Sequence, residues 1–357
     1  MEKPDFELRW VRGLGADIDF TAPNIFFGLG MRGSGKSAWL EMAASKYLDN
    51  GAKVFDLFGA KDGEGLGWLR SPHVKEDGAR AVLFRGDLVE VKSKHESIPA
   101  MKFRISDLDR GDIFISSSPL YSDMDDEFNA VNHLLDVLWK RRRWTSPVFI
   151  IMREAANLIY SRLKIRKNQL LAKSECLYLM RESRHAGLGL GLDSLRHTSI
   201  DIDLRSLVDY LVIKNLGMHS LPDDLEWVYR TIDPPALRRL RPKEFVILDR
   251  QGNIGLGIFS CPAWHKQEQE DILAEVGLEV NYLLPSGRDD QIRELIKEAL
   301  QALPPEPEPN EVSSWIKANR HVDVNYYEVG KQLRPLGYRT DLVFKGGTNR
   351  RVIRKNP

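Results

Sequence analysis

Cysteine is almost absent from this chain of 357 residues, which has only Cys176 and Cys261. Two distant cysteines, without histidines at metal-ligand spacing, exclude a disulfide framework and a zinc site, so we expect both to be core residues. An excess of one charge is also lacking, because the chain has 52 Lys and Arg residues and 51 Asp and Glu residues. The whole protein is therefore no polycation, and contact with nucleic acid would require local basic clusters.

Long apolar runs are missing as well. The first residues lack the apolar core of a signal peptide, and no run approaches the length of a membrane span. We therefore expect a cytoplasmic protein without membrane contact. A hydrophobic content of 42% is nevertheless ordinary for a globular protein, and the length suffices for two domains.

Glycine is concentrated in residues 28–40, GLGMRGSGKSAWL, which follow an apolar run and precede an amphipathic, helix-forming stretch. Gly30, four further residues and then Gly35, Lys36 and Ser37 form the phosphate-loop pattern in the strand–loop–helix context that it requires. Inward-facing N–H groups and the helix N-terminus would bind phosphates. The alternative is a chance Gly-rich turn. We expect the nucleotide to be held by the loop residues Gly30, Met31, Arg32, Gly33, Ser34, Gly35, Lys36, Ser37 and Ala38.

The pattern also predicts the cofactors. Lys36 would reach the β- and γ-phosphates of ATP as a catalytic residue, and the Ser37 hydroxyl would ligate Mg²⁺. Hydrolysis further needs a general base that orients a water molecule. Glu154 is the candidate, since it follows the apolar run 147–152 at the end of a predicted buried strand. The alternative is that its carboxylate caps the next helix.

Strands and helices alternate along most of the chain. Apolar runs at residues 53–58, 147–152, 188–192 and 208–213 are separated by helical stretches, which indicates an α/β fold with a parallel sheet. Residues 245–249 and 254–259 instead predict an antiparallel hairpin. Ligands of such sheets gather at the carboxyl ends of the parallel strands.

Proline marks a predicted boundary near the C-terminus, because residues 303–309 can form neither a helix nor an interior strand. We expect an N-terminal arm (1–24), an ATPase core (25–265), a helical extension (266–302), a semi-rigid linker (303–310) and a winged-helix-like module (311–357). From residue 331 onward, eight basic residues face one acid. This asymmetry predicts DNA binding, with Lys345, Arg350 and Arg351 as contacts. A solvated tail on a protein-docking module is the alternative.

Three segments carry a family resemblance: VFDLFGAKDGEG (54–65), FIIMREAANLI (149–159) and RESRHAGLGLGLDSLRHTSIDID (181–203). Together with the phosphate loop, they resemble the second-strand, Walker B and sensor segments of the HerA–FtsK superfamily of P-loop DNA translocases. The resemblance implies a RecA-like additional-strand fold and homohexameric rings that move double-stranded DNA. It implies that Glu154 activates water and that Arg184, or secondly Arg181, reaches the neighbouring subunit's site.

Two positions depart from the family. Arg153 stands where the family has an Asp that holds the Mg²⁺ water shell, and Leu195 stands where it has a Gln that contacts the γ-phosphate. A cation cannot replace a carboxylate at a metal. Asp193 is the first candidate for that role, because its strand should lie beside both the phosphate-loop and Walker B strands, and Asp56 is the second. Arg153 is then expected to pair with a neighbouring acid.

The sequence therefore predicts an ATPase that translocates or packages double-stranded DNA as a ring. Partners would be duplex DNA, further copies of the chain and a nuclease, capsid or secretion protein. The basic residues that would line the pore are Arg162, Lys164, Arg166 and Lys167, although they also suit a solvated loop. The alternatives are a nucleotide-gated DNA-binding or assembly protein that hydrolyses weakly or not at all, and a P-loop kinase or NTPase acting on a small molecule.

Overall fold

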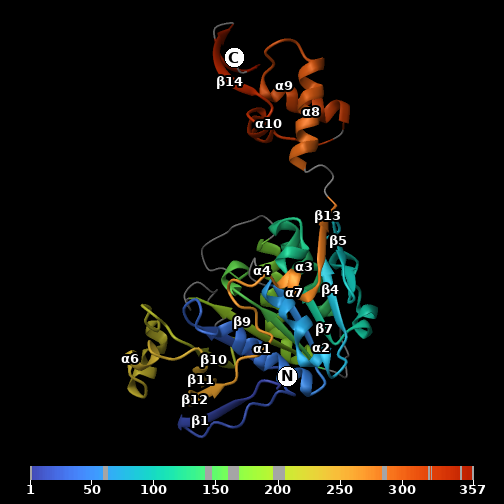
Figure 1. Cartoon of the computed structure of the whole chain (residues 1–357). Helices are drawn as coiled ribbons and strands as arrows, with labels where there is room; N and C mark the ends of the chain where they lie inside the picture. The colour runs from blue at the N-terminus through green and yellow to red at the C-terminus, as the bar shows by residue number, and fades with distance from the viewer. Residues whose placement is uncertain are drawn as a thin grey trace. The chain divides into compact units, whose positions relative to one another are not determined.

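The chain forms two compact units, Met1–Tyr282 and Leu283–Pro357, which are described separately (Figure 1). The computed structural model describes residues 2–58, 63–140, 147–159, 169–195, 206–283, 288–320, 322, 324–345 and 348–355. Within those ranges, no helix is long and apolar enough to cross a membrane.

The first unit is built on a sheet of 11 strands, whose centre is parallel. The five central strands follow one another in the order β10 (Tyr210–Ile213), β2 (Ile25–Leu29), β9 (Leu188–Ser194), β8 (Val148–Met152) and β3 (Lys53–Phe58). Strand β9 thus pairs in parallel with both β2 and β8. This confirms the predicted α/β fold and the insertion of the strand that ends at Asp193.

Two groups of strands extend the sheet on either side. Beyond β3 lie β7 (Ile113–Ser116), β4 (Ala81–Arg85) and β6 (Glu96–Pro99), all parallel. Beyond β10 lie three antiparallel strands, β11 (Glu244–Asp249), β12 (Ile254–Phe259) and β1 (Phe6–Arg12). The predicted hairpin is therefore confirmed, whereas the segment expected to be an N-terminal arm contributes the edge strand β1.

Burial explains why the central strands are continuous apolar runs. Every residue of β2 and of β8 is buried, as expected for parallel strands covered on both faces. Glycines in β9 allow close packing between its neighbours. A Cβ at Gly191 would lie 2.9 Å from the Phe149 ring and 3.0 Å from Leu40, so only glycine lets helix α1 (Lys36–Asp49) approach the sheet here.

Two longer helices and several short elements complete the first unit. Helices α3 (Met124–Lys140) and α4 (Gln169–Ala186) pack against each other. The remaining elements are η1 (Glu64–Arg70), α2 (Pro72–Lys75), β5 (Val89–Lys92), η2 (Ala100–Lys102), η3 (Ile105–Arg110), η4 (Ser118–Leu120), η5 (Ala155–Asn157), η7 (Asp223–Arg230), α6 (Pro234–Leu237), α7 (Ile272–Val276) and β13 (Glu279–Tyr282), of which β13 pairs with β5.

The two cysteines differ in their environment. Cys176 is buried on α4, with its Sγ 3.5 Å from the sulfur of Met152. Cys261 is exposed, so the expectation of a core position is wrong for this residue. It lies two residues beyond β12, where the chain leaves the sheet.

The second unit has a small core of its own. Helices α8 (Arg288–Ala302), α9 (Pro309–Arg320) and α10 (Tyr326–Leu333) pack together with the hairpin of β14 (Tyr338–Lys345) and β15 (Thr348–Lys355). Because Ile292 and Ile296 of α8 share the core with Ile316 of α9, the predicted linker 303–310 lies inside this unit, and its last two residues begin α9. The boundary between the units therefore lies at Tyr282, before the predicted linker. The winged-helix identity stays a prediction.

Candidate nucleotide site

The loop between β2 and α1 has a preformed shape that depends on its glycines. Gly35 has φ 85°, and a Cβ there would lie 2.5 Å from the carbonyl oxygen of Pro242. Gly30 packs equally closely, because a Cβ would lie 2.8 Å from the Cβ of Lys214. The Met31 N–H also donates to the carbonyl of Asn215 at 2.7 Å. The segment that follows β10 thus supports the outer wall of the loop.

The polar groups of the loop fit a phosphate chain. Lys36 is buried, and its Nζ donates to the carbonyl of Met31 at 3.1 Å, so the ammonium lies within the loop. The hydroxyl of Ser34 is buried and has no hydrogen-bond partner among the described residues. A buried hydroxyl without a partner is costly unless a ligand satisfies it. Arg32 is exposed and pairs with Glu268 at 2.5 Å.

Asp193 connects the loop with the sheet. The Ser37 hydroxyl donates to Oδ2 of Asp193 at 3.0 Å. The other oxygen of Asp193, Oδ1, accepts the backbone N–H of Glu154 at 2.5 Å. Asp193 is buried at the end of β9. The structure therefore brings together three of the residues that the sequence singled out.

Glu154 occupies an unusual backbone position at the end of β8. Its φ of 46° lies in the left-handed region, which few residues other than glycine adopt. Such strain clusters at functional sites. Its side chain is exposed and makes no capping hydrogen bond to η5. The alternative of a helix-capping carboxylate is thus unsupported, and the carboxylate remains accessible beside Asp193.

Arg153 is fully buried and points away from this exposed carboxylate, into a group of acids. Its Nη2 lies 2.9 Å from Glu41 and 2.5 Å from Oδ2 of Asp56, while its Nε donates to Oδ1 of Asp56 at 3.2 Å. Its Nη1 lies 3.4 Å from Glu64. The predicted pairing of Arg153 with an acid is confirmed, with three partners. Burial opposes its charge, but the three carboxylates raise the pKa of Arg153 well above its ordinary value.

The ion pair of Arg153 with Asp56 distinguishes the two candidate metal ligands, Asp56 and Asp193, by the partners of their carboxylate oxygens. Both carboxylate oxygens of Asp56 bond Arg153, and Oδ2 also accepts from the indole of Trp68 at 3.1 Å. Burial raises the pKa of Asp56, although Arg153 opposes this effect. Asp193 bonds Ser37 instead. Of the two, Asp193 is therefore the one that lies beside the Ser37 hydroxyl, the metal ligand expected from the sequence.

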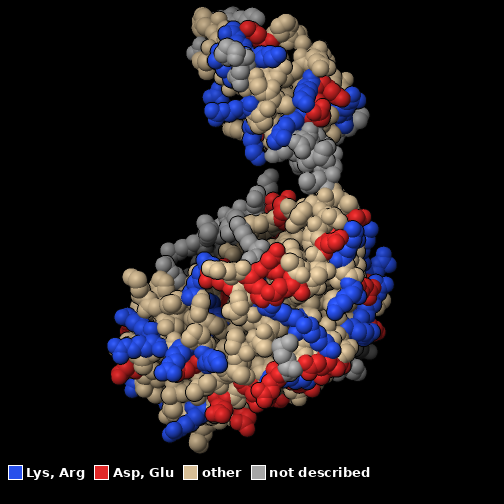
Figure 2. Space-filling view, in the orientation of Figure 1, with Lys and Arg blue, Asp and Glu red and all other residues tan. Residues whose placement is uncertain are grey.

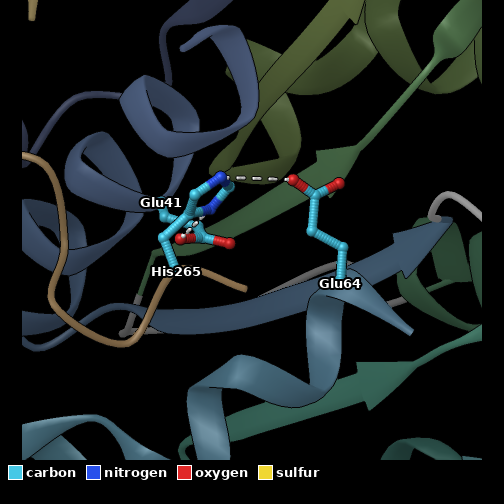
Figure 3. Close-up of side chains that lie close together, drawn as sticks. All are labelled: Glu41, Glu64 and His265. Atoms are coloured by element: carbon cyan, nitrogen blue, oxygen red, sulfur yellow. Dashed lines mark hydrogen bonds and ion pairs between the residues drawn. The ribbon is translucent and has the colours of Figure 1, made fainter. Parts of the chain in front are cut away.

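Three further residues near Arg153 carry no signal in the phosphate-loop pattern. Nδ1 of His265 lies 3.0 Å from Glu41 of α1, and its Nε2 lies 3.6 Å from Glu64 at the start of η1 (Figure 3). One ligand atom from each of the three residues lies within 4.8 Å of the others, a spacing that a metal ion could bridge. The single charge of Arg153 is shared among these two glutamates and Asp56, however, and the imidazole of His265 already lies against both glutamates, so the ligand atoms are paired with one another.

Lys214 is a second cation that the sequence motifs do not reveal. It is fully buried behind the phosphate loop, donates to the carbonyl of Pro242 at 2.7 Å and lies 4.4 Å above the Phe259 ring. Burial lowers the pKa of Lys214 to about 7. Its charge at neutral pH therefore depends on the surroundings of the loop.

The remaining predicted residues divide into described and undescribed ones. Arg181 is exposed on α4, and Leu195 is exposed just after β9. The side chains of Arg184 and Lys345 lie outside the described structure, as do all four predicted pore residues, Arg162, Lys164, Arg166 and Lys167.

Acids accompany part of the basic surface of the second unit, where Figure 2 shows Lys and Arg side chains interspersed with Asp and Glu. Arg350 lies 3.4 Å from Glu308, and Arg354 lies 2.9 Å from Glu306. Arg351 is exposed on β15. The charge offered by this hairpin to a partner is therefore smaller than the sequence count suggests.

Comparisons with known proteins find similar structures only. No protein-family model and no curated protein matches the chain. One similar structure is the genome packaging NTPase B204 from Sulfolobus turreted icosahedral virus 2 in complex with AMP, at 17% identity and a TM-score of 0.37, covering 65% of this chain and 96% of that one.

Two other similar structures come from different systems. The pCW3 conjugation coupling protein TcpA with ATPγS has 12% identity and a TM-score of 0.39, covering 75% of this chain and 69% of its own. The ATPases 2 and 3 of Thermomonospora curvata EccC have 11% identity and a TM-score of 0.38, and the match covers 70% of this chain and 38% of that one. At these low scores, the argument about function rests on the geometry of this chain.

Proposed function

We propose that this chain is a P-loop ATPase of the HerA–FtsK superfamily, which couples ATP hydrolysis to the movement or packaging of double-stranded DNA. The single observation that carries the ATPase proposal is the chain of hydrogen bonds from Ser37 through Asp193 to Glu154. It links the phosphate loop, the inserted strand and the strand that carries the candidate base. The family assignment is supported by the order of the parallel strands and by the sequence segments that resemble the family.

The loop residues would bind the triphosphate. Backbone N–H groups of the loop that are not bonded within the fold, as that of Met31 is, would surround the phosphates. The N-terminus of α1 would add positive potential, and Lys36 would exchange its contact with Met31 for a phosphate oxygen. The Ser34 hydroxyl gains the partner that it lacks. Each of these contacts favours an anionic ligand over water.

Ser37 and Asp193 would hold the metal ion. When bound, Mg²⁺ neutralises charge on the β- and γ-phosphates as they separate. Ser37 offers a hydroxyl ligand, and Asp193 offers a carboxylate oxygen 3.0 Å from it, which suits a hard cation and its water shell. Asp193 thus replaces the acid that the family has at the position of Arg153.

Glu154 would act as the general base. The hydrogen bond from its N–H to Asp193 fixes the backbone, while its exposed carboxylate stays available to orient a water molecule and accept its proton. Because its backbone lies in the left-handed region, Glu154 leaves the extended conformation of β8. Arg153 would not contact the nucleotide. It would stabilise the turn through its ion pairs with Glu41, Asp56 and Glu64.

Ring formation and DNA contact complete the proposal. We propose a homohexamer in which Arg184, or Arg181, completes the neighbouring subunit's site. Arg162, Lys164, Arg166 and Lys167 would contact duplex phosphates from a pore, and Arg351, with Lys345 and Arg350, would do so from the second unit. Such contacts are independent of sequence and weaken with salt.

An ATPase assay with and without duplex DNA tests the proposal against its alternatives. We expect Mg²⁺-dependent turnover that duplex DNA stimulates. Nucleotide binding without turnover would favour the assembly protein, for which Arg153 and Leu195 are the specific observations. Turnover that ignores DNA but responds to a small phosphate acceptor would favour a small-molecule kinase.

A further inference from the structure

Four side chains from four different segments form a closed ring of alternating charge. Arg153 lies 2.9 Å from Glu41 and 3.4 Å from Glu64, and His265 lies 3.0 Å from Glu41 and 3.6 Å from Glu64. Each glutamate thus stands between the guanidinium and the imidazole. Figure 3 shows His265 between the two glutamates. The ring alternates in charge only when His265 is protonated.

The position of His265 is fixed by its neighbours. Trp264 is fully buried and packs on Trp68 at 5.4 Å between ring centroids. Arg70 donates to the carbonyls of Trp264 at 2.9 Å and of His265 at 3.2 Å. Gly67 lets the chain approach, because a Cβ there would lie 2.6 Å from the Trp264 carbonyl. The imidazole is therefore held against the two glutamates by packing that does not depend on its charge.

We propose that His265 is a proton-dependent positioning residue of the nucleotide site: in its protonated form it clamps Glu41 and Glu64 around Arg153 and thereby holds the turn that carries Glu154. This inference rests on the proposed ATPase function. His265 acts through Arg153, whose backbone N–H also donates to the carbonyl of Phe58 at 2.7 Å. No contact of His265 with the nucleotide is part of the proposal.

The surrounding charges favour the proton on His265. Burial alone would lower the pKa of His265, but Glu41 and Glu64 outweigh burial and Arg153, so the pKa lies above its ordinary value. Beyond the ring, Asp56 adds a third carboxylate at Arg153, Asp193 acts on Glu64, and Glu41 acts on the thiol of Cys261. The buried Asp56 and Glu41 and the partly buried Glu64 thus lie around two cations, and loss of the His265 proton would leave only one.

The direction of the pH effect follows from this arrangement. A histidine whose pKa is raised on folding contributes stability that is complete below its unfolded pKa and is lost as the pH rises through the folded value. We therefore expect the clamp to be complete below the ordinary histidine pKa of about 6.5 and to be lost as the pH rises through the raised pKa of His265. The pKa of Lys214 is also lowered, to about 7, so Lys214 can add its own pH dependence to ATP turnover. We therefore assign to the ring only the pH dependence of turnover that is lost when His265 is replaced.

The experiment combines a direct titration with a kinetic readout on the full chain. The pKa of His265 is measured by NMR with ¹⁵N-labelled histidine, and ATP turnover is measured from pH 6 to 9 for wild type and His265→Gln. We expect a pKa above about 6.5, the ordinary value, which falls in Glu64→Gln. We expect His265→Gln to lower kcat several-fold, to leave KM for ATP within about twofold and to lose the alkaline decline of the wild type.

Controls separate the ring from general damage. His133→Gln replaces a partly buried histidine that bonds the carbonyl of Phe103, and it should keep the wild-type pH profile. His265→Asn is a second variant if His265→Gln does not fold, which thermal unfolding checks. Zn²⁺ and Mn²⁺, each added without nucleotide, test whether the three residues of Figure 3 bind a metal instead.

Each outcome decides the inference. An ordinary or lowered pKa of His265 overturns it, whether or not ATP is hydrolysed. An unchanged pH profile in His265→Gln also overturns it, as does stoichiometric Zn²⁺ or Mn²⁺ binding that this variant abolishes. If the wild type binds ATP without turnover, the proposed hydrolysis fails, and the ring is then decided by the NMR titration and by its loss in Glu64→Gln.

Discussion

The Ser37 hydroxyl and Asp193 Oδ2 are joined by a hydrogen bond of 3.0 Å, although the two residues are 156 positions apart in the chain. The bond joins the first turn of α1 to the end of β9. Because β9 lies between β2 and β8, the same carboxylate also reaches the N–H of Glu154. Asp193 is thus the residue through which the phosphate loop contacts the candidate base.

Replacing Lys36 by alanine should abolish ATP binding. Lys36 is the buried cation inside the loop, with its Nζ on the Met31 carbonyl, and its loss leaves the phosphates to backbone N–H groups and hydroxyls. Calorimetric titration with ATP measures the effect. Lys46→Ala, on the same helix but paired with Asp5, should bind as the wild type does. Unchanged affinity in Lys36→Ala would falsify the phosphate-loop interpretation.

Replacing Glu154 by glutamine should leave ATP bound and slow its hydrolysis. Removal of a general base costs about 100- to 10,000-fold in rate. Because the bond to Asp193 uses the backbone N–H, the variant should keep the turn and its nucleotide affinity. Single-turnover hydrolysis measures the rate. A wild-type rate in this variant would remove Glu154 from the mechanism.

Replacing Arg153 by methionine should destabilise the first unit strongly. The change leaves Asp56 and Glu41 buried without their cation, and breaking one partner of a buried ion pair costs roughly 3–5 kcal/mol. Urea unfolding gives the free energy of unfolding. Arg80→Met removes an exposed arginine that lies 3.5 Å from Asp112, and it should cost little. Equal stability of the two variants would contradict the structural role of Arg153.

Removing residues 283–357 should preserve basal ATP turnover and weaken binding to duplex DNA. The truncation follows the boundary between the units, and the removed part has its own core. Each lost phosphate contact should reduce the slope of log affinity against log salt by about 0.9. Fluorescence anisotropy at several salt concentrations measures that slope. Equal slopes for both proteins would assign the second unit to protein docking.

The phosphate loop was predictable because its function fixes both spacing and residue type within eight positions. The preference for Asp193 over Asp56 as the candidate metal ligand followed from the expected place of β9 beside both neighbours, and the structure shows that strand order and a hydrogen bond between Asp193 and Ser37. The strand order itself came from the family resemblance. These features are encoded locally or in the order of elements.

The ring around Arg153 could not be predicted, because its members come from a helix, a strand end, a loop and the segment after β12. The sequence predicted only that Arg153 pairs with a neighbouring acid, and it did not identify Glu41, Glu64 or His265 as members of the ring. The boundary between the units was missed for a related reason. The apolar positions of α8 are compatible with packing on either unit, and only the folded core shows that Ile296 lies with Ile316.

ATP turnover as a function of Mg²⁺ concentration tests the central claim, that Asp193 supplies the metal-shell carboxylate which Arg153 does not. Wild type, Asp193→Asn, Asp56→Asn and Glu154→Gln are compared, with ATP binding and thermal unfolding measured for each. We expect Asp193→Asn to lose Mg²⁺-dependent hydrolysis almost as fully as Glu154→Gln, whereas Asp56→Asn should chiefly be less stable. Wild-type Mg²⁺ dependence in Asp193→Asn, together with an inactive but folded Asp56→Asn, would contradict it.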